Sequence, residues 1–220
     1  MDRSVAARVP RVIDVATWSR REAFDLFRGL RFPYLSLTAD IDASTLRRIH
    51  RRRGFSFTVG LAYAIGKAAN DVPALRRRLR GEAVVEYEEV DPSITVLADG
   101  ETFRFATLPF DRDFRTFAAE AAGRIERART AATLWSEPDR DDLLFMTALP
   151  WVSFTGLVHP APLDPPDSVP RIAWGRFRAK GRRIVLPLNV QAHHALVDGI
   201  DVGRFFEKVE EAAGQRALFR

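Results

Sequence analysis

Two adjacent histidines near the end of the chain are the residues best placed to do chemistry. His193 and His194 stand in the run 191–199, which ends in Asp198 and Gly199, and they are two of only four histidines in 220 residues. The pKa of an imidazole suits proton transfer near neutral pH, so His194 is a candidate general base for a substrate hydroxyl. Asp198 can fix the loop, and Gly199 permits a sharp turn. A second interpretation stays open, in which His194 is a strand-end histidine satisfied by the backbone.

Other kinds of catalytic centre find less support in the sequence. The chain contains no cysteine, which excludes thiolate nucleophiles, disulfides and cysteine-ligated zinc. A covalent intermediate would need Ser, Thr, Lys or a carboxylate instead. His193 and His194 are expected on opposite faces of a strand with no further His or Cys nearby, so we expect no metal site.

The elements that position these residues follow from the hydrophobic pattern. Residues 184–190 form an apolar run typical of a buried strand, and a helix is expected from Asp201 onward. Further strands are expected over 34–41, 84–90, 94–98, 102–108, 143–149, 152–158 and 171–178, and the strand that contains 184–190 is expected to span 182–190. Further helices are expected over 17–29, 56–70 and 114–125, and after Asp42 or Ser44. Because strands and helices are mixed without strict alternation, we expect an α/β (α+β) fold. It would be a two-layer sandwich of helices on a mixed, largely antiparallel sheet.

The composition is that of an ordinary globular chain, with 46% hydrophobic and 29% charged residues. At this length we expect a single domain over residues 1–220. No apolar stretch is long enough to span a bilayer, and no signal peptide is visible at the start. We therefore expect a cytoplasmic location and no membrane partner.

The net charge is +5, and most of the basic residues are arginine. The densest arginine runs lie at 47–48, 51–53 and 76–80. Solvated helix faces are the simplest explanation of such runs. A landing surface for an anionic, phosphate-bearing cosubstrate and a nucleic-acid surface are the alternatives. No nucleic-acid motif accompanies the runs, so we expect no nucleic-acid partner.

The segment 193–199 resembles the His-His-x-x-x-Asp-Gly signature of the chloramphenicol acetyltransferase family. Its His-x-x-x-Asp-Gly core is shared with other CoA-dependent acyltransferases, including the catalytic domain of dihydrolipoamide acyltransferases. Other segments are similar to the chloramphenicol acetyltransferase type in order and spacing, namely 18–24, 91–96, 101–103, 113–114, 149–154, 186–191 and 202–205. The resemblance therefore covers nearly the whole chain.

This resemblance implies a two-layer α/β subunit that assembles as a homotrimer, with active sites in clefts between subunits. It implies acetyl-CoA as the cosubstrate, no metal, and a hydroxyl acceptor that attacks the thioester directly, so that no cysteine is needed. His194 would be the general base. Thr147 would stabilise the oxyanion, and Asp198 would pair with Arg20 to hold the histidine loop.

The family's acceptor pocket looks altered in this chain, whereas its catalytic set looks intact. The resemblance assigns acceptor contacts to Phe27, Arg31, Ser93, Phe103 and Ala173, and a contact with the CoA adenine to Phe177. Arg31 stands where an aliphatic side chain is expected, Ser93 where a longer side chain is common, and Ala173 where the family has threonine. The resemblance as a whole makes an antibiotic-resistance enzyme that acetylates chloramphenicol one expectation. The same chemistry on another hydroxylated molecule and a non-catalytic trimeric relative are the alternatives.

Overall fold

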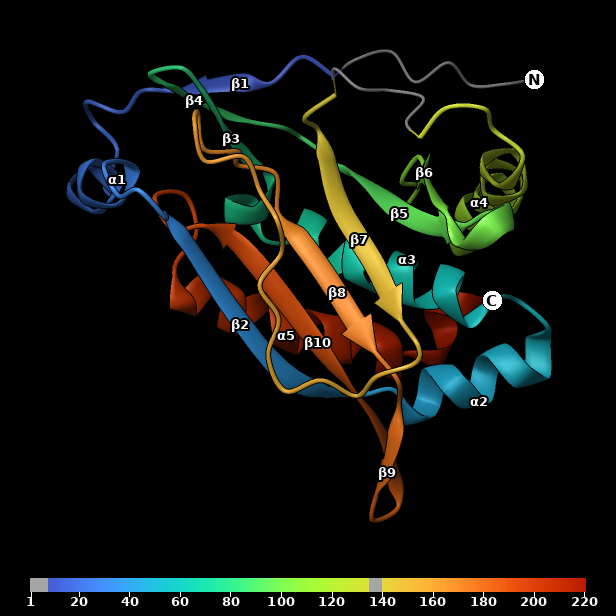
Figure 1. The fold of residues 1–220 in the computed structure, drawn as a ribbon. Helices are drawn as coiled ribbons and strands as arrows, with labels where there is room; N and C mark the ends of the chain where they lie inside the picture. Colours follow the sequence, from blue (N-terminus) through green and yellow to red (C-terminus); the bar gives the residue numbers. More distant parts are fainter. Residues whose placement is uncertain (1–7, 135–139) are drawn as a thin grey trace.

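The computed structural model describes residues 8–134 and 140–220 as one main sheet with helices packed against it (Figure 1). The strands are β1 (Arg11–Ile13), β2 (Tyr34–Asp42), β3 (Arg77–Arg80), β4 (Ala83–Glu86), β5 (Asp91–Leu97), β6 (Phe103–Thr107), β7 (Leu143–Leu149), β8 (Arg171–Gly175), β9 (Arg178–Lys180) and β10 (Arg183–His193). The helices are α1 (Arg21–Arg28), α2 (Ser44–Arg53), α3 (Phe57–Asn70), α4 (Phe114–Arg129) and α5 (Gly199–Gly214).

The main sheet has the strand order β2-β10-β8-β7-β5-β6, with β9 paired to the start of β10. Most neighbours are antiparallel, and only β5–β7 and β7–β8 are parallel. A second, three-stranded antiparallel sheet has the order β1-β4-β3. The expected fold class, helices on a mixed and largely antiparallel sheet, is confirmed.

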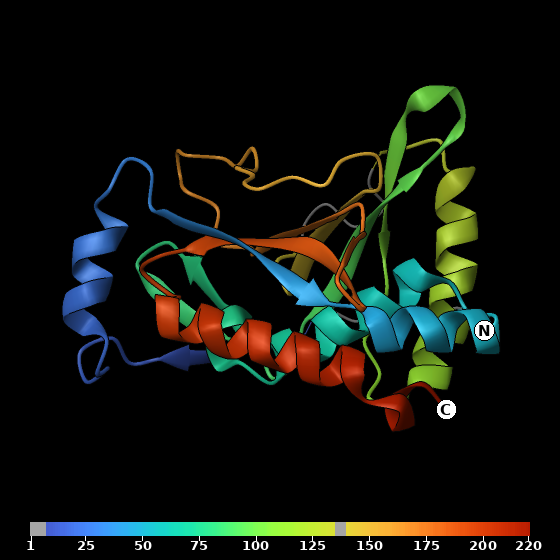
Figure 2. The same ribbon diagram turned by 90° about the horizontal axis from the view of Figure 1, so that it is seen from below.

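Helices α3 and α5 cover one face of the main sheet, and the segment after β7 runs over the other face (Figure 2). Helix α3 is buried along almost all of its length because it packs on the sheet and is flanked by α5, α2 and α4, which explains its apolar sequence. Strand β10 is buried from Val185 to His193, as its long apolar run predicts. No helix among the described residues is long and apolar enough to cross a membrane.

A row of small and polar side chains crosses the sheet on the face without helices. Thr147 pairs with Ala173, Ala173 with Asn189, and Asn189 with Thr38 across four adjacent strands. Thr95 on β5 extends the row, because its hydroxyl lies 2.6 Å from that of Thr147. Directly paired residues point to the same side of a sheet, so this row forms the floor of the open face.

The strand expected over 152–158 is wrong, since these residues form an irregular segment over the open face. Its backbone is bonded elsewhere: Ser36 donates its hydroxyl to Leu157 O, and Arg176 N donates to Val152 O. The expected strand 171–178 also ends early, at Gly175. The short strands β1 and β3 were not expected, because three or four residues rich in arginine give no alternating pattern.

The arginine runs serve different structural purposes. Arg51, Arg52 and Arg53 lie in the last turn of α2, where positive charge is favourable beside the helix carbonyls. The run at 76–80 is not a solvated helix face. Arg78 is fully buried and donates to backbone carbonyls, and Arg77 and Arg80 form ion pairs with Glu86 and Asp141.

Candidate active site

His194 is the first residue after β10, and its ring is held from two sides. Its backbone N donates to Pro33 O at 2.7 Å, and its Nδ1 lies 3.0 Å from Val197 O. A carbonyl only accepts, so Nδ1 carries the proton and Nε2 keeps its lone pair. The Phe27 ring stacks on the imidazole, with 3.8 Å between the ring centroids and 14° between the planes. The ring is thus fixed in place, and its Nε2 makes no hydrogen bond among the described residues.

Arg20, the residue before α1, ties the histidine loop together. Its Nε donates to Ala195 O at 3.0 Å, its Nη2 donates to His194 O at 2.6 Å, and its Nη1 forms an ion pair with Asp198. The contact expected between Arg20 and Asp198 is therefore present. Burial lowers the pKa of Arg20, although the charge of Asp201 opposes this shift.

Asp198 also links the loop to α5. It is the N-cap of this helix, where it accepts from the backbone of Asp201 and its own backbone N donates to the Asp201 carboxylate at 3.0 Å. Its Oδ1 lies 3.4 Å from His194 Nδ1. The helix, the loop and the imidazole are consequently positioned by one carboxylate.

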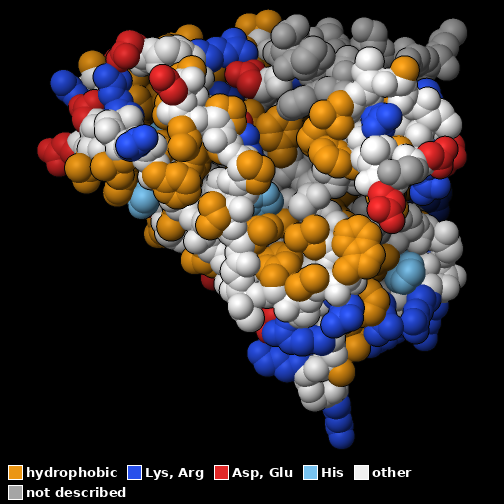
Figure 3. Space-filling view, viewed as in Figure 1, with side chains coloured by type: hydrophobic (Ala, Val, Ile, Leu, Met, Phe, Trp, Pro, Cys, Tyr) orange, Lys and Arg blue, Asp and Glu red, His pale blue; other side chains and the backbone are white. Residues whose placement is uncertain are grey.

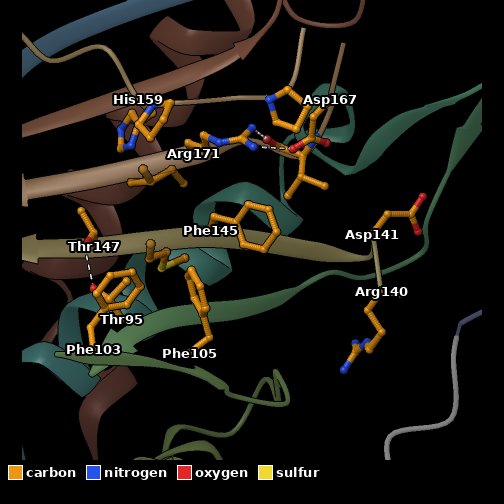
Figure 4. Close-up of a pocket in the computed structure, with 15 residues that line it drawn as sticks. Thr95, Phe103, Phe105, Arg140, Asp141, Phe145, Thr147, His159, Asp167 and Arg171 are labelled. Carbon is orange, nitrogen blue, oxygen red and sulfur yellow. Dashed lines mark hydrogen bonds and ion pairs between the residues drawn. The ribbon is translucent and has the colours of Figure 1, made fainter. Parts of the chain in front are cut away.

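A cavity of about 570 Å³ lies on the part of the sheet formed by β5 to β8, under the segment that follows β7 (Figure 4). The Thr95–Thr147 hydroxyl pair lies at one end of it and Asp141 and Arg140 at the other. The lining residues come from β5 to β8 and from the segments before β7 and β8, and they are Thr95, Phe103, Phe105, Arg140, Asp141, Phe145, Met146, Thr147, His159, Pro160, Pro162, Asp167, Val169, Arg171 and Ile172.

The charges that line this cavity are already paired with other protein groups. Arg171 forms an ion pair with Asp167, and Asp141 pairs with Arg80 at 2.9 Å. Arg140 holds the buried carboxylates of Asp91 and Asp142, which raises its pKa further. The walls combine aromatic rings with internally compensated charges, which suits an uncharged, amphipathic ligand better than an ion.

Hydrophobic side chains gather over the middle of this face, and Lys and Arg gather below them around β9 (Figure 3). Phe177, between β8 and β9, is 39% exposed. The guanidinium of Arg47 lies 4.4 Å from the centroid of its ring. This surface presents an aromatic ring amid positive charge.

His194 and Thr147 do not meet within one chain. Thr147 pairs with Ala173, which pairs with Asn189 of β10, and His194 lies beyond the end of that strand. At the usual rise per residue, this offset is about 16 Å along the strand. Accordingly, neither His194 nor Arg20, Phe27 or Asp198 lines the cavity.

The other residues assigned by resemblance lie in three kinds of place. Phe103 lines the cavity. Ser93 and Ala173 are buried on the same sheet face but do not line the cavity, and the Ser93 hydroxyl has no hydrogen-bond partner among the described residues. Arg31 is exposed just after α1 and does not line the cavity of its own chain.

Thr95 and His159 are cavity residues that sequence reasoning missed. Thr95 stands within a strand that was expected, but its neighbour across the parallel strands could not be known. His159 lies outside every expected strand and helix and outside every segment of the resemblance. Within the described ranges, no group of three or more His, Asp or Glu side chains is placed to bind a metal ion.

Comparison with known proteins agrees with this architecture. The profile of the family described as chloramphenicol acetyltransferase matches residues 10–210. Chloramphenicol acetyltransferase 3 of Escherichia coli is 31% identical over 206 residues, which cover 92% of this chain and 96% of that protein. The chloramphenicol acetyltransferase of Streptomyces acrimycini is 30% identical over 209 residues, covering 91% and 93%.

Solved structures give the same result at the level of the fold. A chloramphenicol acetyltransferase structure superimposes with a TM-score of 0.87 at 26% identity, covering 93% of this chain and 99% of that one. A probable dihydrolipoamide acetyltransferase from Listeria monocytogenes shares the fold with a TM-score of 0.64 at 15% identity, covering 96% and 95%. Since the family profile spans nearly the whole chain and the relatives match over almost their full length, the chain belongs to the chloramphenicol acetyltransferase family of acyltransferases.

Proposed function

We propose that this protein transfers acetyl from acetyl-CoA to a hydroxyl of a small molecule by direct attack, with His194 as the general base. The observation that carries the proposal is the contact of His194 Nδ1 with Val197 O, 3.0 Å apart. Val197 O fixes the proton on Nδ1, so the lone pair of Nε2 is available for the acceptor hydroxyl. Family membership supports acetyl transfer itself.

In the proposed reaction, Nε2 of His194 takes the proton as the acceptor oxygen attacks the thioester carbonyl. A tetrahedral intermediate forms, its C–S bond breaks, and the departing CoA thiolate takes the proton back from the imidazolium. The products are the acetyl ester and CoA. Asp198, 3.4 Å from Nδ1, favours the transient positive charge on the ring.

Thr147 would donate its hydroxyl proton to the oxyanion of that intermediate. Its Oγ1 lies 2.6 Å from that of Thr95, so Thr95 can donate to Thr147 while Thr147 donates to the oxyanion. Such a chain polarises the outer hydroxyl. One oxyanion donor is worth about a hundred- to a thousand-fold in rate.

We propose a homotrimer in which each active site combines His194 of one subunit with the Thr147 cavity of its neighbour. The separation of these residues in one chain, about 16 Å along β10, supports a shared site. Each chain would then supply a base to one site and a cavity to another.

The exposed Phe177 ring and the arginine beside it fit the binding of acetyl-CoA. An aromatic face can stack on adenine, and a guanidinium can pair with phosphate. We place the CoA adenine against Phe177 on this basis, with no metal required. We further propose that residues 1–220 form a single domain that works in the cytoplasm.

Chloramphenicol is the first acceptor to consider, because the relatives named above are chloramphenicol acetyltransferases. The charged pairs on the cavity wall favour a second candidate, another hydroxylated molecule that is more polar along its length. In both cases Phe27, Phe103, Ser93, Ala173 and Arg31 remain the proposed acceptor-side residues. We disfavour a non-catalytic relative because the contacts that the proposed mechanism needs are present, from His194 to Val197 O, from Arg20 to His194 O and between the Thr95 and Thr147 hydroxyls.

The test is purified protein with acetyl-CoA and a thiol-detecting reagent, first with chloramphenicol and then with a panel of hydroxylated compounds. The chain has no cysteine, so all thiol signal comes from released CoA. His194→Ala is expected to lower turnover by about a hundred- to ten-thousand-fold while the oligomer is kept. His50→Ala, on α2, is the matched control. Retention of more than a tenth of wild-type turnover by His194→Ala would refute the assignment.

A further inference from the structure

A second imidazole, that of His159, lines the cavity that contains Thr147 (Figure 4). Two residues of β10 hold it. The backbone N of His159 donates to Gln191 Oε1 at 2.9 Å, and its O accepts from Gln191 Nε2 at 3.2 Å. Its ring Nε2 lies 3.0 Å from Asn189 Oδ1. The ring is therefore fixed to the central strand of the sheet although it belongs to an irregular segment.

The neighbours of Asn189 determine which ring nitrogen of His159 carries the proton. The Asn189 amide nitrogen lies 3.3 Å from Leu37 O and 3.1 Å from Leu157 O. These carbonyls only accept, so the amide NH2 faces them and Oδ1 faces His159. His159 Nε2 must then donate to Asn189. Burial, helped by the charge of Arg171, lowers the pKa of His159 and keeps the ring neutral at neutral pH.

The remaining ring nitrogen, Nδ1 of His159, has a lone pair and no hydrogen-bond partner in the described part of the chain. It is not sealed in the interior, because the fully buried side-chain atoms without partners are Nε of Arg76, Oγ of Ser93, Oγ1 of Thr107 and Nε2 of His193. The guanidinium of Arg171, by contrast, donates to Val169 O and Asp167. His159, a residue that lines the cavity, thus has an unused hydrogen-bond acceptor that is not fully buried.

We propose that His159 is a specificity-determining residue whose Nδ1 accepts a hydrogen bond from a second hydroxyl or N–H group of the acetyl acceptor. The inference rests on the proposed function and names its substrate class: uncharged molecules with at least one donor besides the hydroxyl that is acetylated. Asn189 is the positioning residue that fixes the tautomer. A simple alcohol gains nothing from this contact.

The kinetic test compares wild type with His159→Leu on two probes. Chloramphenicol has a secondary hydroxyl and an amide N–H besides its primary hydroxyl, and 3-(4-nitrophenyl)propan-1-ol keeps the ring and the primary hydroxyl without a second donor. We expect kcat/KM for chloramphenicol to fall about tenfold in His159→Leu, chiefly through KM, because a donor loses its partner. For the simple alcohol we expect a change of less than about twofold.

Two results would overturn the inference without touching the proposed function. An equal loss of kcat on both probes would make His159 part of the reaction machinery rather than a specificity residue. Unchanged kinetics on both probes, with acetyl transfer intact, would leave His159 no part in recognition. If the wild-type protein itself shows no acetyl transfer, this result would instead count against the proposed function.

A second measurement on the wild-type protein needs no acceptor. In protein labelled with 15N-histidine, the resonances of His159 are identified by their loss in His159→Leu. We expect a proton on Nε2 and none on Nδ1 at neutral pH, and in Asn189→Ala a mixture of the two tautomers. A proton on Nδ1 in the wild type would overturn the inference, because that nitrogen could not accept a hydrogen bond.

Discussion

Replacing Arg20 should displace His194, the proposed general base, while the rest of the fold is kept. One guanidinium holds two carbonyls of the histidine loop and the Asp198 carboxylate, at 3.0 Å from Ala195 O and 2.6 Å from His194 O. Its side chain is only 12% exposed, whereas Asp198 is 37% exposed. In Arg20→Ala, the two partly buried carbonyls lose a charged donor, and the more exposed carboxylate regains water.

The expected cost to stability follows from these exposures. Hydrogen bonds to a charged donor contribute about 1.5–3 kcal/mol each, and the partly solvated ion pair adds little more. We expect the free energy of unfolding to fall by about 3–6 kcal/mol in Arg20→Ala. Arg20→Lys keeps the charge but cannot reach three acceptors in a fork, so an intermediate loss is expected.

The loss of activity should exceed the loss of folded protein. A displacement of the His194 loop by about 1 Å lowers the reaction rate by about a hundredfold. This loss should appear as a lower kcat rather than as a higher KM for acetyl-CoA. The assay is thermal unfolding together with steady-state kinetics at a temperature where every variant is folded. Arg21→Ala is the matched control, because this neighbouring side chain is 60% exposed. If folded Arg20→Ala and Arg20→Lys both keep kcat within about threefold of wild type, the reasoning is refuted.

Three further changes test neighbouring parts of the account. Thr95→Val should lower kcat about three- to tenfold with little change in KM, since Thr147 loses its donor; an unchanged kcat would remove Thr95 from the oxyanion site. Burial lowers the pKa of His193 from its ordinary value of 6.5 to about 4. At a pH below 6.5, the unfolded chain therefore binds more protons than the folded one. The free energy of unfolding should fall by about 3 kcal/mol from pH 6.5 to 4 and should fall less in His193→Gln, as measured by denaturant titration; equal slopes would contradict this. Arg31→Leu should raise chloramphenicol turnover if the guanidinium enters a neighbour's cavity, and an unchanged, already high wild-type rate would show that Arg31 is harmless there.

The parts of the fold that the sequence predicts best are those whose residues meet one kind of environment. Strand β10 is buried on both faces and α3 is buried nearly all round, so both appear as long apolar runs. The segment 152–158 is apolar enough to look like a strand. Its backbone, however, forms hydrogen bonds with side chains of β2 and β10 and with the residue after β8, which only the tertiary structure supplies.

The candidate site was predictable only where its residues are local in sequence. His194 and Asp198 share one loop, and their pattern suggests a fixed imidazole. The contact of Arg20 with Asp198 came from family resemblance, because no local pattern joins the start of α1 to the start of α5. The partner of Thr147 depends on strand register, and the role of His159 depends on the amide orientation of Asn189. Neither can be read from periodicity.

The most direct test of the central claim is complementation between two inactive variants. His194→Ala and Thr147→Ala are co-expressed with different tags, and trimers that contain both are purified and assayed for acetyl transfer. If each site takes His194 from one subunit and Thr147 from the next, every mixed trimer regains one intact site, which is about a third of the wild-type sites. We predict this recovery of activity in mixed trimers and none in either parent. Mixed trimers as inactive as their parents would contradict the shared site and, with it, the proposed roles of the two residues.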